Sequence, residues 1–187
     1  RKAAILIKEA LKILRRDVFG RNYYKRYTGN SVEICSQIVK DRWNEIYFST
    51  GDSIYNDQFW IRDACICLDG LISLGYDRQI KNCLEWAVGV YEKNNEIGTT
   101  ILGKEMVFTF WSFPADSLPL LLRALKVAGL YDVAYEHRSF LDLQIEIYFK
   151  KVLNLKTKLI NPESFSTPKD VITRKQTCVA NAFMIYL

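Results

Sequence analysis

The sequence predicts an all-α fold in which helical hairpins form part of an α/α toroid, with about seven helices and one short β-hairpin excursion. Three observations predict it. Most segments repeat apolar residues with the helical period, and short turns such as the one at 74–77 alternate with long polar loops. The sequence has no fixed-period repeat of the solenoid kind, which favours a toroid over an open array of helix pairs.

Length and composition indicate one globular domain. The 187 residues are 49% hydrophobic and 25% charged, which argues against disorder, and no apolar run reaches the roughly 18 to 20 residues of a membrane span. The chain begins at Arg1 and stops at Leu187 inside a predicted helix, so we expect residues 1–187 to be a single domain truncated at both ends. We expect no membrane partner, and the oligomeric state is left open.

Cysteine and histidine usage bears on location and cofactors. Five cysteines without CxxC spacing indicate small buried residues in a cytoplasmic protein rather than disulfides or a zinc site. The single histidine, His137, lies among charged residues and is expected at the surface. We therefore expect no metal and no organic cofactor.

Apolar spacing and caps predict the first helices. Residues 3–18 have one apolar face, which we expect to be buried and which consists of Ala3, Leu6, Ile7, Ala10, Leu11, Leu14 and Val18. Asn30 or Ser31 caps a second helix from Val32 to roughly Ile46. A polar loop over 47–56 leads to a buried helix over 60–74, which Gly75 ends.

The remaining elements follow the same signals. A helix from Asp77 to about Lys93 should turn one apolar face inward, namely Ile80, Leu84, Ala87, Val88 and Tyr91. Residues 94–112 break the pattern and include a β-favouring run, so a short hairpin is expected there. Further helices are predicted from Asp116 or Ser117 to Gly129, over 131–153, and from about 173, after a polar loop over 154–173.

The stretch 59–63, Phe-Trp-Ile-Arg-Asp, places charge at the start of an apolar helix. One reading is structural: Arg62 and Asp63 form an ion pair that caps a core helix, where the helix dipole favours an Asp. The other is a polar pocket floor, with Phe59 and Trp60 as stacking surfaces and the two charged groups bonded to a polyhydroxylated ligand. Sugars need both kinds of contact because their C–H faces are apolar and their edges carry hydroxyls.

Three segments together resemble one family. Residues 59–63, followed by a helix that ends at Leu74-Gly75-Tyr76, resemble the W-x-R-D helix of the glucoamylase-like glycoside hydrolases, which are six-hairpin (α/α)6-toroid enzymes. Residues 110–116, Phe-Trp-Ser-Phe-Pro-Ala-Asp, with Pro119 and Arg123, are similar to the Trp, Pro and Asp-x-Pro elements of the third hairpin region. Residues 169–187 look like the acid-bearing loop and the helix after it.

The resemblance implies an oligosaccharide or polysaccharide substrate. Arg62 and Asp63 would hold the hydroxyls of the nonreducing sugar in the subsite before the cleaved bond. Trp60 and Trp111 would form the apolar walls, and Asp116 would join the substrate-binding set.

The same resemblance implies an inverting mechanism with Asp170 as the general acid. Inversion needs an acid and a base about 6.5 to 9.5 Å apart, and the family's base would lie beyond Leu187. The sequence departs from the family at Pro168-Lys169-Asp170, where relatives carry Trp-Glu-Glu. Lys169 favours ionised Asp170, which works against a proton donor. Asp170 as an ordinary helix N-terminal charge stays open, and Glu163 is a second candidate.

Two other functions remain as alternatives. A catalytically inactive helical domain could bind carbohydrate or another protein through the same pocket. The net charge of +5 includes basic residues between Arg15 and Arg26 that are interleaved with tyrosines, a pattern also found in nucleic-acid binding. That run is short and fits no nucleic-acid motif, so we expect a solvated loop and no nucleic-acid partner.

Overall fold

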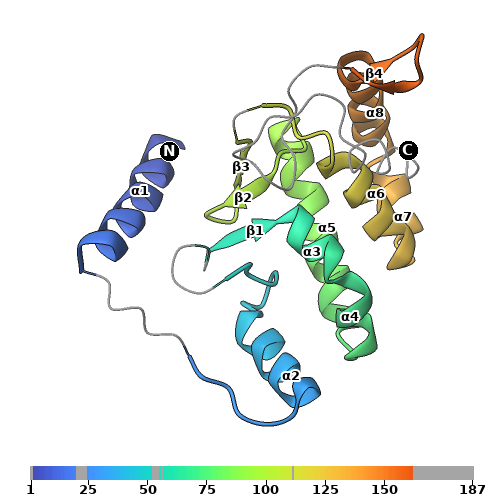
Figure 1. The fold of residues 1–187 in the computed structure, drawn as a ribbon. Coiled ribbons are helices and arrows are strands. Elements are labelled where there is room, and N and C mark those ends of the chain that lie inside the picture. The colour runs from blue at the N-terminus through green and yellow to red at the C-terminus, as the bar shows by residue number, and fades with distance from the viewer. Residues whose placement is uncertain (1, 20–24, 52–54, 56, 111, 162–187) are drawn as a thin grey trace.

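The computed structural model of the chain describes residues 2–19, 25–51, 55, 57–110 and 112–161. This part is mostly helical, as predicted, with eight helices and two small antiparallel sheets (Figure 1). The helices are α1 (Lys2–Phe19), α2 (Ser31–Arg42), α3 (Ile61–Ile66), α4 (Leu68–Ser73), α5 (Asp77–Asn94), α6 (Ser117–Val127), α7 (Tyr131–Glu136) and α8 (Arg138–Val152). The predicted final helix lies outside the described residues.

The predicted hairpin is present and belongs to a three-stranded sheet. Strands β2 (Thr100–Leu102) and β3 (Met106–Phe108) form the hairpin, and β1 (Gln58–Trp60) pairs with β2 on its other side. Trp60 lies opposite Thr100, and the Thr100 hydroxyl donates to the Phe59 carbonyl at 2.7 Å. The sequence did not predict β1, because its partner strand is some 40 residues away. A second pair, β4 (Leu153–Asn154) and β5 (Leu159–Ile160), begins at the last residue of the helix predicted over 131–153 and extends into the predicted polar loop.

The single helix predicted over 60–74 is wrong in two respects. Trp60 belongs to β1, and the helix is interrupted at Cys67 between α3 and α4. Arg123 Nη1 donates to the Cys65 carbonyl at 3.3 Å, the oxygen that a continuous helix would pair with the amide of Asp69. A side chain that enters the backbone ladder in this way bends a helix.

The helix predicted over 131–153 is also interrupted. His137 separates α7 from α8, and its Nδ1 lies 2.8 Å from Glu92 Oε2 on α5. Its side chain is 15% exposed, so the histidine predicted at the surface is partly buried there by its contact with Glu92. No glycine or proline marks this break, which explains why the periodic pattern ran through it.

Several helix ends follow their sequence signals. Asn30 caps α2, and its side chain accepts from the amides of Val32 and Glu33 while Glu33 bonds back to the Asn30 amide. Gly75 and Gly129 have φ of 82° and 68° and follow α4 and α6. In both turns, hydrogen bonds run back to the last helical carbonyls, the arrangement in which glycine avoids a Cβ penalty.

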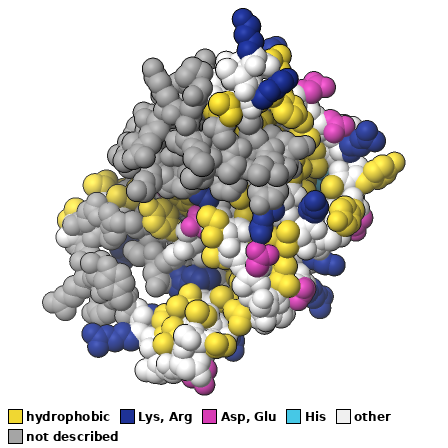
Figure 2. Space-filling view, turned by 45° about the vertical axis from the view of Figure 1, so that its right-hand side comes forward, with side chains coloured by type: hydrophobic (Ala, Val, Ile, Leu, Met, Phe, Trp, Pro, Cys, Tyr) yellow, Lys and Arg dark blue, Asp and Glu magenta, His cyan; other side chains and the backbone are white. Residues whose placement is uncertain are grey.

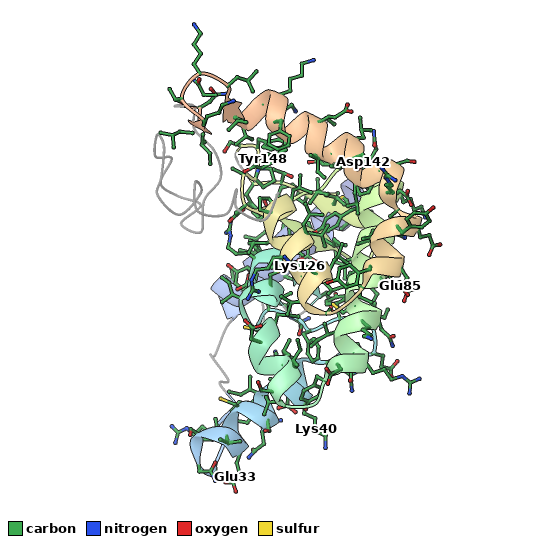
Figure 3. All side chains as sticks on the ribbon, turned by 90° about the vertical axis from the view of Figure 1, so that its right-hand side faces the viewer. Glu33, Lys40, Glu85, Lys126, Asp142 and Tyr148 are labelled. Atoms are coloured by element: carbon green, nitrogen blue, oxygen red, sulfur yellow. The ribbon has the colours of Figure 1, made fainter. Side chains whose placement is uncertain are left out.

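The core lies between α3, α5, α6 and the sheet. All five residues predicted on the inward face of α5 are buried: Ile80, Leu84, Ala87, Val88 and Tyr91. Helix α3 packs against α6 and α4 against α5. Figure 3 shows α8, with Tyr148, across one end of these helices and α2, with Glu33 and Lys40, at the other end.

Helix α1 is oriented opposite to the prediction. The face expected to be buried is exposed, with Ile7 at 59%, Leu11 at 57% and Val18 at 67%. The stripe Ile5, Glu9 and Lys12 instead faces the sheet, and α1 lies at one edge of the molecule (Figure 1). Helix α2 also contributes no buried residue, and Figure 2 shows hydrophobic side chains on the surface where α2 lies. The N-terminal helices therefore add little to the core.

Polar contacts attach α1 to the start of β1. Lys12 donates to Asp57 at 2.6 Å and to Glu9 at 3.0 Å. Burial lowers the pKa of Lys12, but these two hydrogen bonds outweigh it and leave that pKa raised. The hydrogen bond from Lys12 lowers the pKa of Asp57. Opposite charges thus stabilise each other's ionised forms at this contact.

The cysteines divide into two groups. Cys65 and Cys83 are buried, as predicted, whereas Cys35 and Cys67 are exposed, which corrects the expectation of buried cysteines; Cys178 lies outside the described residues. Burial raises the pKa of Cys83 to about 12 and also raises that of Cys65. Among the helices that the structure describes, none combines the length and apolar character needed to cross a membrane.

Candidate functional site

A buried ion pair joins two of the segments singled out in the sequence. Arg62 Nε lies 2.6 Å from Asp116 Oδ2, and the two side chains are 8% and 3% exposed. Arg62 is in the first turn of α3 and Asp116 directly precedes α6, 54 positions later. Removing either partner would leave the other charge buried and unpaired, which would destabilise the fold. The ion pair therefore holds the start of α3 next to the start of α6.

Asp116 is the partner of Arg62 rather than a helix cap. It occupies the capping position of α6, but its side chain makes no capping hydrogen bond. Its carboxylate instead accepts from Arg62. Sequence reasoning placed both residues near a ligand but did not pair them with each other.

Asp63 is separated from Arg62 by the geometry of the helix. Arg62 is buried, whereas Asp63 is exposed. Successive residues differ by about 100° around a helix, so one side chain turns inward and the next turns outward. The pair expected to act as a unit therefore consists of an internal cation and an external carboxylate.

The aromatic residues of the motif also differ from expectation. Phe59 is fully buried between Tyr47 and Trp86, at ring distances of 6.0 and 5.6 Å, so the prediction that it is a stacking surface is wrong. Trp60 is 9% exposed, and one face of its indole stacks on Phe110 at 5.2 Å and 17°. Phe110, which the sequence analysis left out of the site, is half-buried. The aromatic-rich segment 108–113 in which it lies was the sequence signal that could have indicated its contact with Trp60.

The start of α6 carries further buried polar groups. Tyr148 of α8 donates to the Ala115 carbonyl at 2.8 Å, and burial, followed by the nearby Asp116, raises the Tyr148 pKa. Figure 3 shows Tyr148 on α8. Asp116 Oδ1 and Ser117 Oγ are buried without a hydrogen-bond partner within the described ranges. The second carboxylate oxygen of Asp116 can therefore accept a further hydrogen bond.

Other predicted site residues cannot be placed relative to this cluster. Trp111, Glu163 and Asp170 lie outside the described residues. The structure thus brings Arg62 together with Asp116 and Trp60 together with Phe110, and Asp63 follows Arg62 at the surface. The convergence of Trp111 and Asp170 on this cluster remains a prediction.

One pocket within the described part of the chain is unsuited to sugars. A small pocket is lined by apolar and thiol side chains, namely Phe48, Ala64, Leu68, Leu71, Ile80, Cys83, Leu84 and Ala124. Such a lining offers almost no partners for hydroxyl groups. Within the described ranges, no group of three or more His, Cys, Asp or Glu side chains could hold a metal ion.

Comparisons with known proteins add no relative. No protein-family model, curated protein or solved structure matches the chain. The likeness to glucoamylase-like enzymes rests on the quoted motifs alone.

Proposed function

We propose that the chain is a glycoside hydrolase-like domain of the six-hairpin toroid type, which hydrolyses an oligosaccharide or glucan by an inverting mechanism. One observation carries the proposal. The two segments that resemble family motifs, 59–63 and 110–116, lie in contact through the Arg62–Asp116 pair and the Trp60–Phe110 stack. These segments are distant in sequence, so their meeting agrees with a shared role.

The chemistry of the cluster suits one end of a sugar chain. The Asp63 carboxylate is exposed and can accept hydrogen bonds from two hydroxyls. Arg62, held by Asp116, keeps the first turn of α3 rigid beneath it. Trp60 and Phe110, together with Trp111, supply the apolar wall that C–H faces require.

The proposed reaction uses side chains only. Asp170 donates a proton to the leaving oxygen, and a second carboxylate activates water from the opposite side. That base is not assigned to any described residue. The proposed reaction requires no metal ion and no organic cofactor. Free thiols on the four described cysteines support the proposed cytoplasmic location.

A second candidate is a binding domain without catalysis, for either carbohydrate or protein. Lys169 beside Asp170 favours it, because a neighbouring cation stabilises the ionised carboxylate and weakens a proton donor. This candidate keeps the same cluster as its binding site and differs only in turnover.

Asp63→Asn tests the proposed sugar contact. We expect affinity for maltotetraose, measured by calorimetry, to fall about tenfold to a hundredfold, because a hydrogen bond to a charged acceptor contributes about 1.5–3 kcal/mol. Asp132→Asn is the matched control, since Asp132 is also an exposed aspartate in the first turn of a helix.

Turnover separates the two candidates. In the full-length protein, sugar release should drop strongly in Asp170→Asn with binding retained, whereas binding without any release by the unmodified full-length protein would favour the binding domain. Equal affinity in Asp63→Asn and the unmodified chain would overturn the sugar site itself.

A further inference from the structure

A chain of hydrogen bonds connects α1 to the indole of Trp60. Trp60 Nε1 donates to Gln58 Oε1 at 2.9 Å, and Gln58 Nε2 donates to Glu9 Oε2 at 2.8 Å. Glu9 Oε1 in turn accepts from Lys12 at 3.0 Å. Gln58 and Trp60 are two residues apart on β1, so their side chains leave the same face of the strand.

Burial makes this arrangement informative. Glu9 is 8% exposed and Gln58 is 6% exposed. A buried carboxylate and a buried amide are unfavourable unless they are hydrogen-bonded. On a helix with many exposed aliphatic side chains, the burial of a glutamate requires a specific partner.

The chemistry of the three groups allows only one orientation of the Gln58 amide. An indole N–H can only donate, and an ionised carboxylate can only accept. The amide oxygen must therefore face Trp60 and the amide nitrogen must face Glu9, as the two distances have it. Reversing the amide would lose both bonds. The indole is thus fixed at its N–H edge by Gln58, on one face by Phe110, and by an edge-to-face contact with Tyr55 at 5.6 Å.

We infer that Gln58 and Glu9 are positioning residues, which hold the Trp60 indole in the orientation that the ligand contacts. The inference rests on the proposed function and adds to it a role for α1, a helix outside the family motifs. Glu9 fixes the Gln58 amide, and Gln58 fixes the rotation of the indole on Phe110.

The test combines a spectroscopic and a binding readout on the 187-residue chain. The indole ¹H–¹⁵N resonance of Trp60, identified by its loss in Trp60→Phe, reports the hydrogen bond directly. In Gln58→Leu we expect this resonance to move and maltotetraose affinity to fall about tenfold, because the indole N–H loses its acceptor. Glu9→Gln keeps an acceptor for Gln58 and should give a smaller change in the same direction.

Matched controls share the chemistry but not the contact. Gln79→Leu and Glu146→Gln repeat the two substitutions at sites with no contact to Trp60 among the hydrogen bonds described. Both should leave the indole resonance and the affinity unchanged. If Gln58→Leu fails to fold, Glu9→Gln carries the test alone.

The outcomes are distinguishable. An unmoved Trp60 resonance in both variants would overturn the inference, as would a moved resonance with unchanged affinity. A moved resonance with reduced affinity supports it. If the unmodified chain binds no maltotetraose while the resonance moves, the proposed function fails and the positioning of the indole stands.

Discussion

Helices α1 and α5 have equally clear amphipathic sequences but use them in opposite ways. In α5, every residue predicted to face inward is buried. In α1, the predicted inward face is exposed, and the polar stripe with Glu9 and Lys12 contacts the sheet through Gln58 and Asp57. The same amphipathic pattern therefore occurs in a helix that packs through its apolar face, α5, and in a helix that contacts the sheet through its polar face, α1.

The difference shows what hydrophobic periodicity can establish. It identifies the face of a helix that is apolar, because 3.6-residue spacing collects those side chains on one side. It does not identify the surface that the helix contacts. Buried charge then becomes the stronger signal, since a residue such as Glu9 or Arg62 is buried only with a partner.

The largest expected effect comes from breaking the buried charge pair of the core. Asp116→Ala should lower the free energy of unfolding by about 3–5 kcal/mol, because Arg62 would lose its buried counter-charge. Urea denaturation measures this. Asp69→Ala is the matched control: Asp69 accepts from Arg123 at 2.8 Å but is 66% exposed, so its loss should cost no more than about 1 kcal/mol. Equal costs would mean that burial does not distinguish the two pairs.

Two identical substitutions sharpen the contrast between the helices. Leu121→Ala in α6 should cost about 2–5 kcal/mol, because Leu121 is fully buried. Leu14→Ala in α1 should change stability by no more than about 0.5 kcal/mol, because Leu14 is 57% exposed. Both are measured by urea denaturation. A large loss in Leu14→Ala would show that the apolar face of α1 is covered in solution.

The smallest effect concerns the pH dependence of α1 docking. The folded pKa of Asp57 lies below its unfolded value of about 3.9. The stability that ionised Asp57 contributes to the folded state is therefore fully present above about pH 4. It is lost as the pH falls through the lower pKa that Asp57 has in the folded state. Backbone NMR signals of α1 should change in this acidic window before those of α5. Asp57→Asn should remove the transition, at a cost of no more than about 1 kcal/mol; simultaneous change in both helices would contradict the prediction.

Local signals in the sequence were sufficient for much of the fold. Asn30, Gly75 and Gly129 marked helix ends correctly, because caps and left-handed turns depend on one or two residues. The breaks at Cys67 and His137 were missed. They coincide with contacts from Arg123 and Glu92, which no local pattern contains.

The candidate site was predicted in part for the same reason. The sequence singled out Trp60, Arg62 and Asp116 as chemically unusual, and the structure pairs Arg62 with Asp116. It could not tell that Arg62 pairs with Asp116 or that Gln58 supports Trp60, because these are tertiary contacts. The placement of Trp111 and Asp170 near this site stays a prediction.

The pairing of β1 has a consequence for the order of folding. Trp60 meets Thr100 across the sheet, and Arg62 meets Asp116 still later in the chain. Contacts between distant residues form slowly, because a long loop must close before they stabilise anything. We therefore expect α5 and the hairpin to form first and the long-range contacts of Trp60 and Arg62 to form among the last steps.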